Sequence, residues 1–143
     1  MAVLTIRTVT AMGDNVIIAV CNMLLPLTML GLGLMIRLTK PGYGDAFGYR
    51  TTWSLKSKET WERAQGLFGG LCTKVYAVIS FVSLICGIIP IVGGFDKDVS
   101  GIIACILNSV QFISVFVIIG ITDGIVKREF DKDGNRKGGE LNE

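Results

Sequence analysis

Three long stretches of this sequence carry no charged residue, and they limit the fold more than any other feature. They are Val16 to Ile36, Val75 to Phe95 and Gly101 to Thr122. A helix rises 1.5 Å per residue, so about 20 residues cross the roughly 30 Å hydrocarbon core of a bilayer. The first stretch exceeds the apolar part of a signal peptide and lacks an Ala-x-Ala-like site, which favours an uncleaved helix. The sequence therefore predicts an all-α membrane protein with three transmembrane helices, at about residues 16–36, 70–92 and 101–122.

The composition agrees with a membrane protein and excludes several kinds of function. Half of the residues are hydrophobic and 18% are charged, whereas about 25% are charged in soluble domains. The chain has no histidine, which excludes His-based acid–base catalysis, Ser/His or Cys/His nucleophiles and imidazole metal sites. Without histidine, and without a pair of carboxylates on any one helix stripe, we expect no enzyme. We also expect no cofactor and no metal. A net charge of +2 without a basic, aromatic stripe argues against nucleic-acid binding.

The ends of the second span have two interpretations. If Pro90 lies inside the helix, the uncharged stretch is long enough and Lys74 flanks it. If the helix stops before Pro90, it must begin near Leu67 and then contains Lys74. In both versions a short connection around residues 93–100 joins the second and third spans, which predicts an antiparallel hairpin.

Positive charges predict the orientation in the membrane. The loop at residues 37–66 and the C-terminal segment are rich in Lys and Arg, whereas residues 1–15 carry only Arg7. Loops rich in Lys and Arg stay on the inner side, so we expect the N-terminal segment 1–15 outside and the loop and C-terminus in the cytoplasm.

After the membrane domain at residues 16–125, we expect a flexible polar tail at residues 126–143, with a turn at Asp133–Gly134.

Each span carries a stripe of polar and small residues when it is wrapped at 100° per residue. Lipid gives no hydrophobic drive for helix association, so such stripes are where helices meet. The stripes contain an intramembrane polar seam: Asn22, Ser80, Ser83, Asn108, Gln111 and Asp123. We interpret this seam as hydrogen-bonding glue between helices; the alternative is a polar path through a small transporter or channel component. A second protomer could also bury part of the stripes, so a homo-oligomer is expected.

The loop at residues 37–66 is rich in residue types that lie at membrane surfaces. Its basic residues are surrounded by four aromatic ones: Tyr43, Tyr49, Trp53 and Trp61. This composition is typical of an aromatic belt at headgroup depth over anionic lipid. From Lys58 the sequence predicts a helix with Ser57 as its N-cap, and we expect it to be an interfacial helix that precedes the second span.

The residues between Phe47 and Gln65 form a specific motif. Its pattern is Gly-x-Arg-Thr, a Trp-Ser pair, a polar turn and then Trp-x-x-Ala-Gln, and it is met at Gly48, Arg50, Thr51, Trp53, Ser54, Trp61, Ala64 and Gln65. With one span before the loop and a two-span hairpin after it, residues 16–125 resemble the SdpI family of bacterial membrane proteins, which is named for immunity to a secreted toxin.

The resemblance implies a multi-pass protein of the bacterial cytoplasmic membrane that protects against a membrane-active toxin or signals its presence. Its partners would then be the lipid bilayer and either a toxin or a cytoplasmic regulatory protein. The resemblance brings no catalytic residues with it.

Arg50 is the expected centre of the motif, and it has two interpretations. Its guanidinium group could hold a lipid phosphate or a partner's carboxylate bidentately, while Trp53 and Trp61 fix the depth of the loop. Alternatively, Arg50 folds the loop by capping carbonyl groups or by pairing with one of three nearby acids: Asp45, Glu59 or Glu62.

Overall fold

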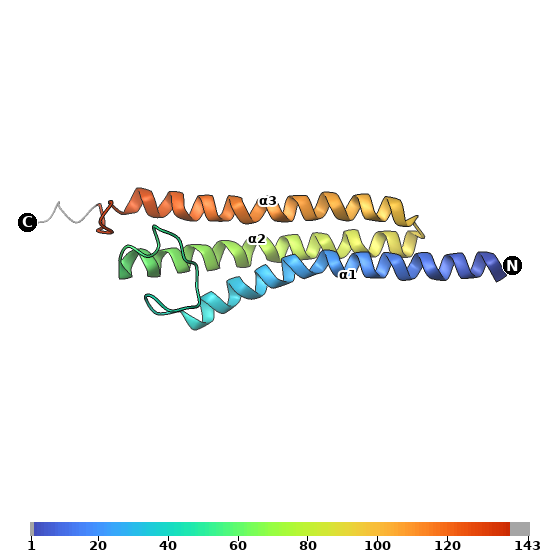
Figure 1. Cartoon of the computed structure of the whole chain (residues 1–143), viewed down its shortest axis with the longest axis horizontal. Helices are drawn as coiled ribbons and strands as arrows, with labels where there is room; N and C mark the ends of the chain where they lie inside the picture. Colours follow the sequence, from blue (N-terminus) through green and yellow to red (C-terminus); the bar gives the residue numbers. More distant parts are fainter. Residues whose placement is uncertain (1, 138–143) are drawn as a thin grey trace, which may run out of the picture. The chain divides into compact units, whose positions relative to one another are not determined.

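Three long helices make up most of the computed structural model, which describes the backbone of residues 2–137 and side chains from residue 9 onward. The helices are α1 (Ala2–Thr39), α2 (Lys58–Gly93) and α3 (Lys97–Glu129), drawn in Figure 1. Within this described part, all three are long and apolar enough to cross a membrane, α1 over Val9–Thr39. The predicted all-helical class is confirmed, with three helices that can span.

Each helix is longer than the uncharged stretch that predicts it. No helix is predicted for residues 2–15, yet α1 begins at Ala2, and α3 continues to Glu129. An apolar stretch sets only the minimum length of a spanning helix. Polar residues on either side can continue the helix until a capping residue or a helix breaker ends the helix. The side chain of Arg7, which entered the prediction of orientation, lies outside the described residues.

The second helix, α2, is continuous from Lys58 to Gly93 and contains Pro90. Of the two interpretations of the second span, the one with Pro90 inside the helix therefore holds. The predicted interfacial helix is wrong as a separate element, because no break in the helix separates Lys58 from the apolar stretch. Lys74 lies within this same helix with its side chain exposed.

A reciprocal pair of hydrogen bonds starts α2 at the predicted cap. The backbone N–H of Thr60 donates to Ser57 Oγ at 3.2 Å, and the N–H of Ser57 donates to Thr60 Oγ1 at 2.9 Å. Both bonds satisfy backbone donors that the first turn of a helix leaves without partners. Ser57 is therefore confirmed as the N-cap.

Contacts divide the chain into two compact units, each built from parts of all three helices. The first unit comprises Met1–Met29 and Val75–Ser114, and the second comprises Leu30–Lys74 and Val115–Glu143. The connection between α2 and α3 belongs to the first unit. The long connection between α1 and α2, loop 40–57, belongs to the second.

The first unit has a polar interior and an apolar surface. Gln111 is 1% exposed, whereas its neighbour Phe112 is 58% exposed. Gln111 Nε2 donates to Ser83 Oγ at 2.9 Å and lies 3.4 Å from Asn22 Oδ1. The hydroxyl of Tyr76 donates to the carbonyl of Gln111 at 3.1 Å. These bonds join all three helices through polar contacts, as expected where the surroundings are lipid.

Two other residues of the predicted polar seam take no part in these bonds between helices. Ser80 is buried, and its hydroxyl has no hydrogen-bond partner among the described residues. Asn108 is half-buried and donates to the carbonyl of Ala104 at 2.9 Å, within α3 itself. The stripe in the sequence therefore predicts correctly that both residues lie on or near the buried side of their helices. It does not predict that neither of them bonds to another helix.

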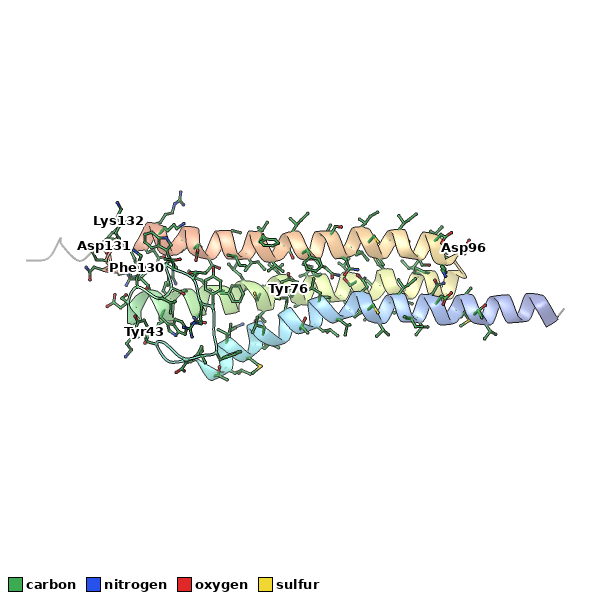
Figure 2. The ribbon with its side chains drawn as sticks, in the orientation of Figure 1. Tyr43, Tyr76, Asp96, Phe130, Asp131 and Lys132 are labelled. Atoms are coloured by element: carbon green, nitrogen blue, oxygen red, sulfur yellow. The ribbon has the colours of Figure 1, made fainter. Side chains whose placement is uncertain are left out.

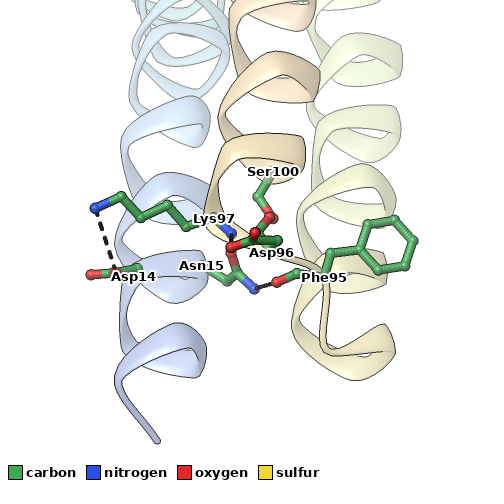
Figure 3. A network of polar contacts seen from close by, with 6 residues as sticks. All are labelled: Asp14, Asn15, Phe95, Asp96, Lys97 and Ser100. Carbon is green, nitrogen blue, oxygen red and sulfur yellow. Dashed lines mark hydrogen bonds and ion pairs between the residues drawn. The ribbon is translucent and has the colours of Figure 1, made fainter. Parts of the chain in front are cut away.

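Asn15 binds the end of the first unit where α2 turns into α3, as Figure 3 shows. Its Nδ2 donates to the carbonyl of Phe95 at 3.0 Å and to that of Pro90 at 3.3 Å. The nearby pair between Lys97 Nζ and Asp14 Oδ2 is 4.0 Å long and exposed, so it contributes little. The buried amide, rather than the ion pair, ties α1 to this turn.

In the second unit, α1 and α2 approach each other through glycines. A Cβ atom on Gly33 would lie 2.8 Å from the Cβ of Cys72 and 2.9 Å from the backbone nitrogen of Thr73. A Cβ atom on Gly69 would lie 3.2 Å from the carbonyl oxygen of Gly33. Only residues without side chains allow two membrane helices to come this close.

Within the second unit, residues 130–137 fold against the start of α2 instead of extending as a tail from residue 126. Phe130 is buried and forms an isolated β-bridge with Arg136. Gly134 has a φ of 88°, and its N–H donates to the carbonyl of Asp131 at 3.3 Å. The turn predicted at Asp133–Gly134 is confirmed, whereas residues 138–143 of the predicted flexible tail lie outside the described residues.

Replacing Gly33 by alanine should destabilise the protein by about 1–3 kcal/mol, the usual cost of overpacking. The methyl group would collide with α2 at Cys72 and Thr73. Gly31→Ala is the matched control, because a Cβ atom there meets nothing within 4 Å. Thermal unfolding of the purified protein in detergent measures both. An equal midpoint for the two variants would show that α1 and α2 do not touch at Gly33.

Candidate functional site

The first residues of loop 40–57 are held by a tryptophan of α2. Lys40 has a φ of 46°, and its N–H donates to the carbonyl of Ile36 at 3.1 Å, which ends α1 and turns the chain. The carbonyl of Pro41 then accepts a hydrogen bond from Trp61 Nε1 at 2.8 Å. The ring of Tyr43, labelled in Figure 2, meets the Trp61 ring edge-on, with centroids 6.2 Å apart. Trp61 is fully buried as a result.

The middle of the loop is bound by Gln65, one turn further along α2. Gln65 Oε1 accepts the N–H of Tyr49, and Gln65 Nε2 donates to the Tyr49 carbonyl, both at 2.7 Å. Gly48 has a φ of 136°, and a Cβ atom there would lie 3.0 Å from Gln65 Oε1 and 3.1 Å from the Trp61 ring. The motif therefore needs a glycine before Tyr49 and a primary amide at position 65.

Asp123 of α3 accepts hydrogen bonds from two hydroxyl groups of the loop. Its Oδ1 lies 3.0 Å from the Tyr49 hydroxyl and 2.8 Å from Thr51 Oγ1. The Tyr49 ring stacks on Phe68, with centroids 4.3 Å apart. Burial, together with the Asp123 carboxylate, raises the pKa of the Tyr49 hydroxyl, so the phenol stays protonated and donates. These bonds fasten the loop to α3 as well as to α2.

Ser54 forms the inner turn of the loop. Its Oγ accepts the N–H of Thr51 at 2.8 Å and lies within hydrogen-bonding distance of two carbonyls, those of Tyr49 at 3.1 Å and Thr51 at 3.0 Å. Ser54 is completely buried. Its hydroxyl therefore replaces the backbone partners that this short turn cannot provide.

The loop also contacts the end of α3 and the turn that follows it. The Trp53 ring lies near two cations, with Lys56 Nζ 4.3 Å and Lys127 Nζ 5.7 Å from its centroid. Lys56 Nζ donates to the carbonyl of Lys132, which is labelled in Figure 2. Ser57 Oγ donates to the carbonyl of Gly134 at 2.8 Å.

A bidentate ion pair reinforces the same contact between α2 and the end of α3. Arg63 Nε and Nη2 bind the two carboxylate oxygens of Glu129 at 2.7 and 2.6 Å. This paired geometry is the strongest form that an ion pair takes near a protein surface. The two residues lie on different helices, so the pair fixes where α3 ends relative to the start of α2.

Arg50 is the member of the motif that lies on the surface. Its side chain is exposed, and Nη1 donates to the carbonyl of Asp45 at 2.9 Å. Within the described residues it forms no ion pair with Asp45, Glu59 or Glu62. Of the two interpretations of Arg50, the carbonyl-capping contact is present, and the rest of its guanidinium group faces outward.

In the structure, most of the predicted motif residues lie in one cluster, whereas the residues of the predicted polar seam do not all lie together. Gly48, Thr51, Ser54, Trp61 and Gln65 lie together, with Trp53 at the contact to α3 and Arg50 outside. Asn22, Ser83 and Gln111 lie together in the first unit. Asp123 belongs to the loop cluster instead. The sequence predicts Tyr49 and Trp61 in an aromatic belt at headgroup depth, whereas the structure buries both in the cluster. Reasoning from the sequence missed Thr60, whose Oγ1 lies 3.3 Å from the Ser54 carbonyl oxygen.

The cluster is suited to holding the loop in one conformation. Its donors and acceptors are mostly bonded to one another, as the contacts of Gln65, Ser54 and Asp123 show. Among residues 9–137, no three His, Cys, Asp or Glu side chains gather where they could hold a metal ion. The surface that this loop presents, centred on Arg50, is therefore the candidate site for recognition.

Replacing Gln65 by methionine should open the loop. The change keeps the volume but leaves the buried N–H and carbonyl of Tyr49 unpaired, at a cost of about 1–3 kcal/mol for each group. Trypsin should then cleave after Arg50 and Lys56 faster than in the parent protein. Glu59→Met, at an exposed position on the first turn of α2, is the control. Unchanged cleavage in Gln65→Met would show that Gln65 does not hold the loop.

Comparison with known proteins adds one match. The family model described as the SdpI/YfhL protein family matches residues 43–122. This stretch is more than half of the chain and contains every motif residue from Gly48 to Gln65. No curated protein and no solved structure matches the chain. The resemblance read from the motif is confirmed, and this chain is a multi-pass membrane protein that belongs to the SdpI/YfhL family.

Proposed function

We propose that this protein gives a bacterial cell immunity to a membrane-active toxin, or signals the presence of that toxin, without catalysing a reaction. Family membership supports this role. The observation that carries it is the division of labour in the motif: Gln65, Ser54 and Asp123 hold the loop, while Arg50 is left exposed. Such an arrangement presents a binding surface on a fixed support.

The loop and the C-terminal turn lie on one side of the membrane in this proposal. Three contacts between them support it: Arg63 with Glu129, Lys56 with the Lys132 carbonyl, and Ser57 with the Gly134 carbonyl. Both segments are rich in Lys and Arg, which selects the cytoplasmic side of the bacterial inner membrane. The N-terminus is then outside.

The partner that we propose for the loop carries a carboxylate or phosphate group. Arg50 uses Nη1 for the carbonyl of Asp45, and the remaining N–H groups of its fork can bind such a group bidentately. Trp53, whose ring lies near Lys56 and Lys127, adds an aromatic surface to the same loop. A toxin or a cytoplasmic regulatory protein could provide the matching acid.

A transporter or channel component is the less well supported alternative. Gln111 and Ser83 of the first unit bond to each other between helices, and Asn108 bonds within its own helix. The cavity beside them, lined by Asn15 and Asn22 among others, has a volume of about 10 Å³. This is room for about one water molecule. The seam therefore supports packing better than it supports a path for solutes.

Arg50→Ala should abolish protection in a toxin challenge while the protein still inserts into the membrane. Its side chain is exposed, so the loss should change the free energy of unfolding by no more than about 0.5 kcal/mol. Arg50→Lys keeps the charge without the fork and should restore little protection. Survival of cells that express each variant, at matched membrane amounts, measures the effect.

Two outcomes would contradict the proposal at different levels. Full protection by Arg50→Lys would exclude bidentate recognition but keep the immunity role. Equal killing of cells with and without the gene, across a panel of membrane-active toxins, would exclude the immunity role itself.

Arg128→Ala is the control variant. It removes a positive charge from an exposed residue near the end of α3, on the side of the membrane where we propose that the loop lies.

A further inference from the structure

A cavity of about 540 Å³ opens in the second unit where α1 ends and α2 begins. Its walls are the last turn of α1, the turn that follows it and the first turns of α2, with a lining that includes Arg37, Lys40, Tyr43, Lys58, Glu62 and Gly66. The two helices touch at Gly33 and Gly69, and loop 40–57 spans the space beyond that contact. The volume falls within the roughly 300–1,000 Å³ that small-ligand sites occupy.

The lining of this cavity is basic. Three cations, Arg37, Lys40 and Lys58, stand against one carboxylate, that of Glu62. Lys58 Nζ lies 3.9 Å from Glu62 Oε1, and both side chains are largely exposed, so this pair is weak. Within residues 9–137, Arg37 and Lys40 form no ion pair. The cavity therefore offers two positive charges that no residue of the described chain neutralises.

A second acid near this wall is already occupied. The carboxylate of Asp45 accepts the N–H of Gly42 at 2.6 Å, within its own turn. That bond stabilises the turn that forms one side of the cavity, and Asp45 itself is not part of the lining. No ion pair joins Asp45 to Arg37 or Lys40 among the described residues, so both cations remain available to a ligand.

The surroundings of the cavity fit a phospholipid better than a soluble anion. Ile36 lines the cavity, and Leu34, Met35 and Leu38 are exposed on the last turns of α1, Leu38 at 81%. The apolar length of α1 ends here, so the cavity lies at the depth of the lipid headgroups. A phospholipid with its phosphate among the cations would lay its acyl chains along these side chains.

We propose that this cavity binds the phosphate-bearing headgroup of an anionic glycerophospholipid. Arg37 holds two phosphate oxygens with its fork of N–H groups, and Lys40 adds a point charge beside it. Lys58 completes the positive lining from the α2 side. The carboxylate of Glu62 accepts hydrogen bonds from a hydroxyl-bearing headgroup such as glycerol, while the net positive lining disfavours a headgroup that carries its own cation.

Native mass spectrometry of the full chain tests this site. The detergent-purified protein is mixed with equal amounts of phosphatidylglycerol and phosphatidylcholine that carry the same acyl chains. The parent protein should retain phosphatidylglycerol in preference, and Arg37→Gln/Lys40→Gln should lower the retained ratio about thirtyfold. This is the loss expected when two cations no longer attract the net negative charge that phosphatidylglycerol carries and phosphatidylcholine lacks. Arg128→Gln/Lys132→Gln removes the same charge from the end of α3 and its turn, and should keep the ratio.

Three results would overturn the proposal. The first is equal retention of the two lipids by the parent protein, and the second is an equal loss in the control variant, which would indicate diffuse attraction instead of a site. The third is displacement of phosphatidylglycerol by millimolar glycerol 3-phosphate or inorganic phosphate, which would indicate a soluble anion. If the double variant unfolds, Lys58→Gln, at an exposed position, replaces it and must also lower the ratio.

Discussion

Helices in a bilayer have to associate without a hydrophobic drive, because lipid chains surround Leu and Phe as favourably as protein does. The protein meets this constraint by turning polar and small groups inward. In the first unit, Gln111 binds Ser83 and approaches Asn22, while large apolar side chains face outward. In the second, Gly33 lets α1 pack directly against α2 at Cys72. Both solutions replace burial of apolar surface with close or hydrogen-bonded contact.

The loop between α1 and α2 is also held by buried polar groups that bond to one another. Gln65 satisfies both backbone groups of Tyr49, and Asp123 accepts the hydroxyls of Tyr49 and Thr51. A buried polar group without a partner costs more than a hydrogen bond contributes, so breaking any one of these bonds should loosen the loop. The family motif is therefore mainly a folding motif for the loop. Arg50 is its outward-facing member, and the recognition role that we propose rests on this division.

The sequence predicts features that depend on local pattern and misses those that depend on distant partners. Apolar length predicts the spans, and the 100° stripes place Asn22 and Gln111 on buried faces. A stripe does not say what its residues touch, so Asp123 is read as a seam residue although it binds the loop. The charged, glycine-rich segment after α3 reads as a flexible tail, because the bond of Ser57 to Gly134 has no local signature.

Hydrogen exchange at the backbone amides of Tyr49 and Thr51, measured in lipid nanodiscs, tests the central claim that the loop is a folded part of the membrane domain. The Tyr49 amide binds Gln65 and the Thr51 amide binds Ser54. Both should exchange about a hundred times more slowly than in an unstructured peptide. Exchange of these two amides at the unstructured rate, with α2 still protected, would contradict it.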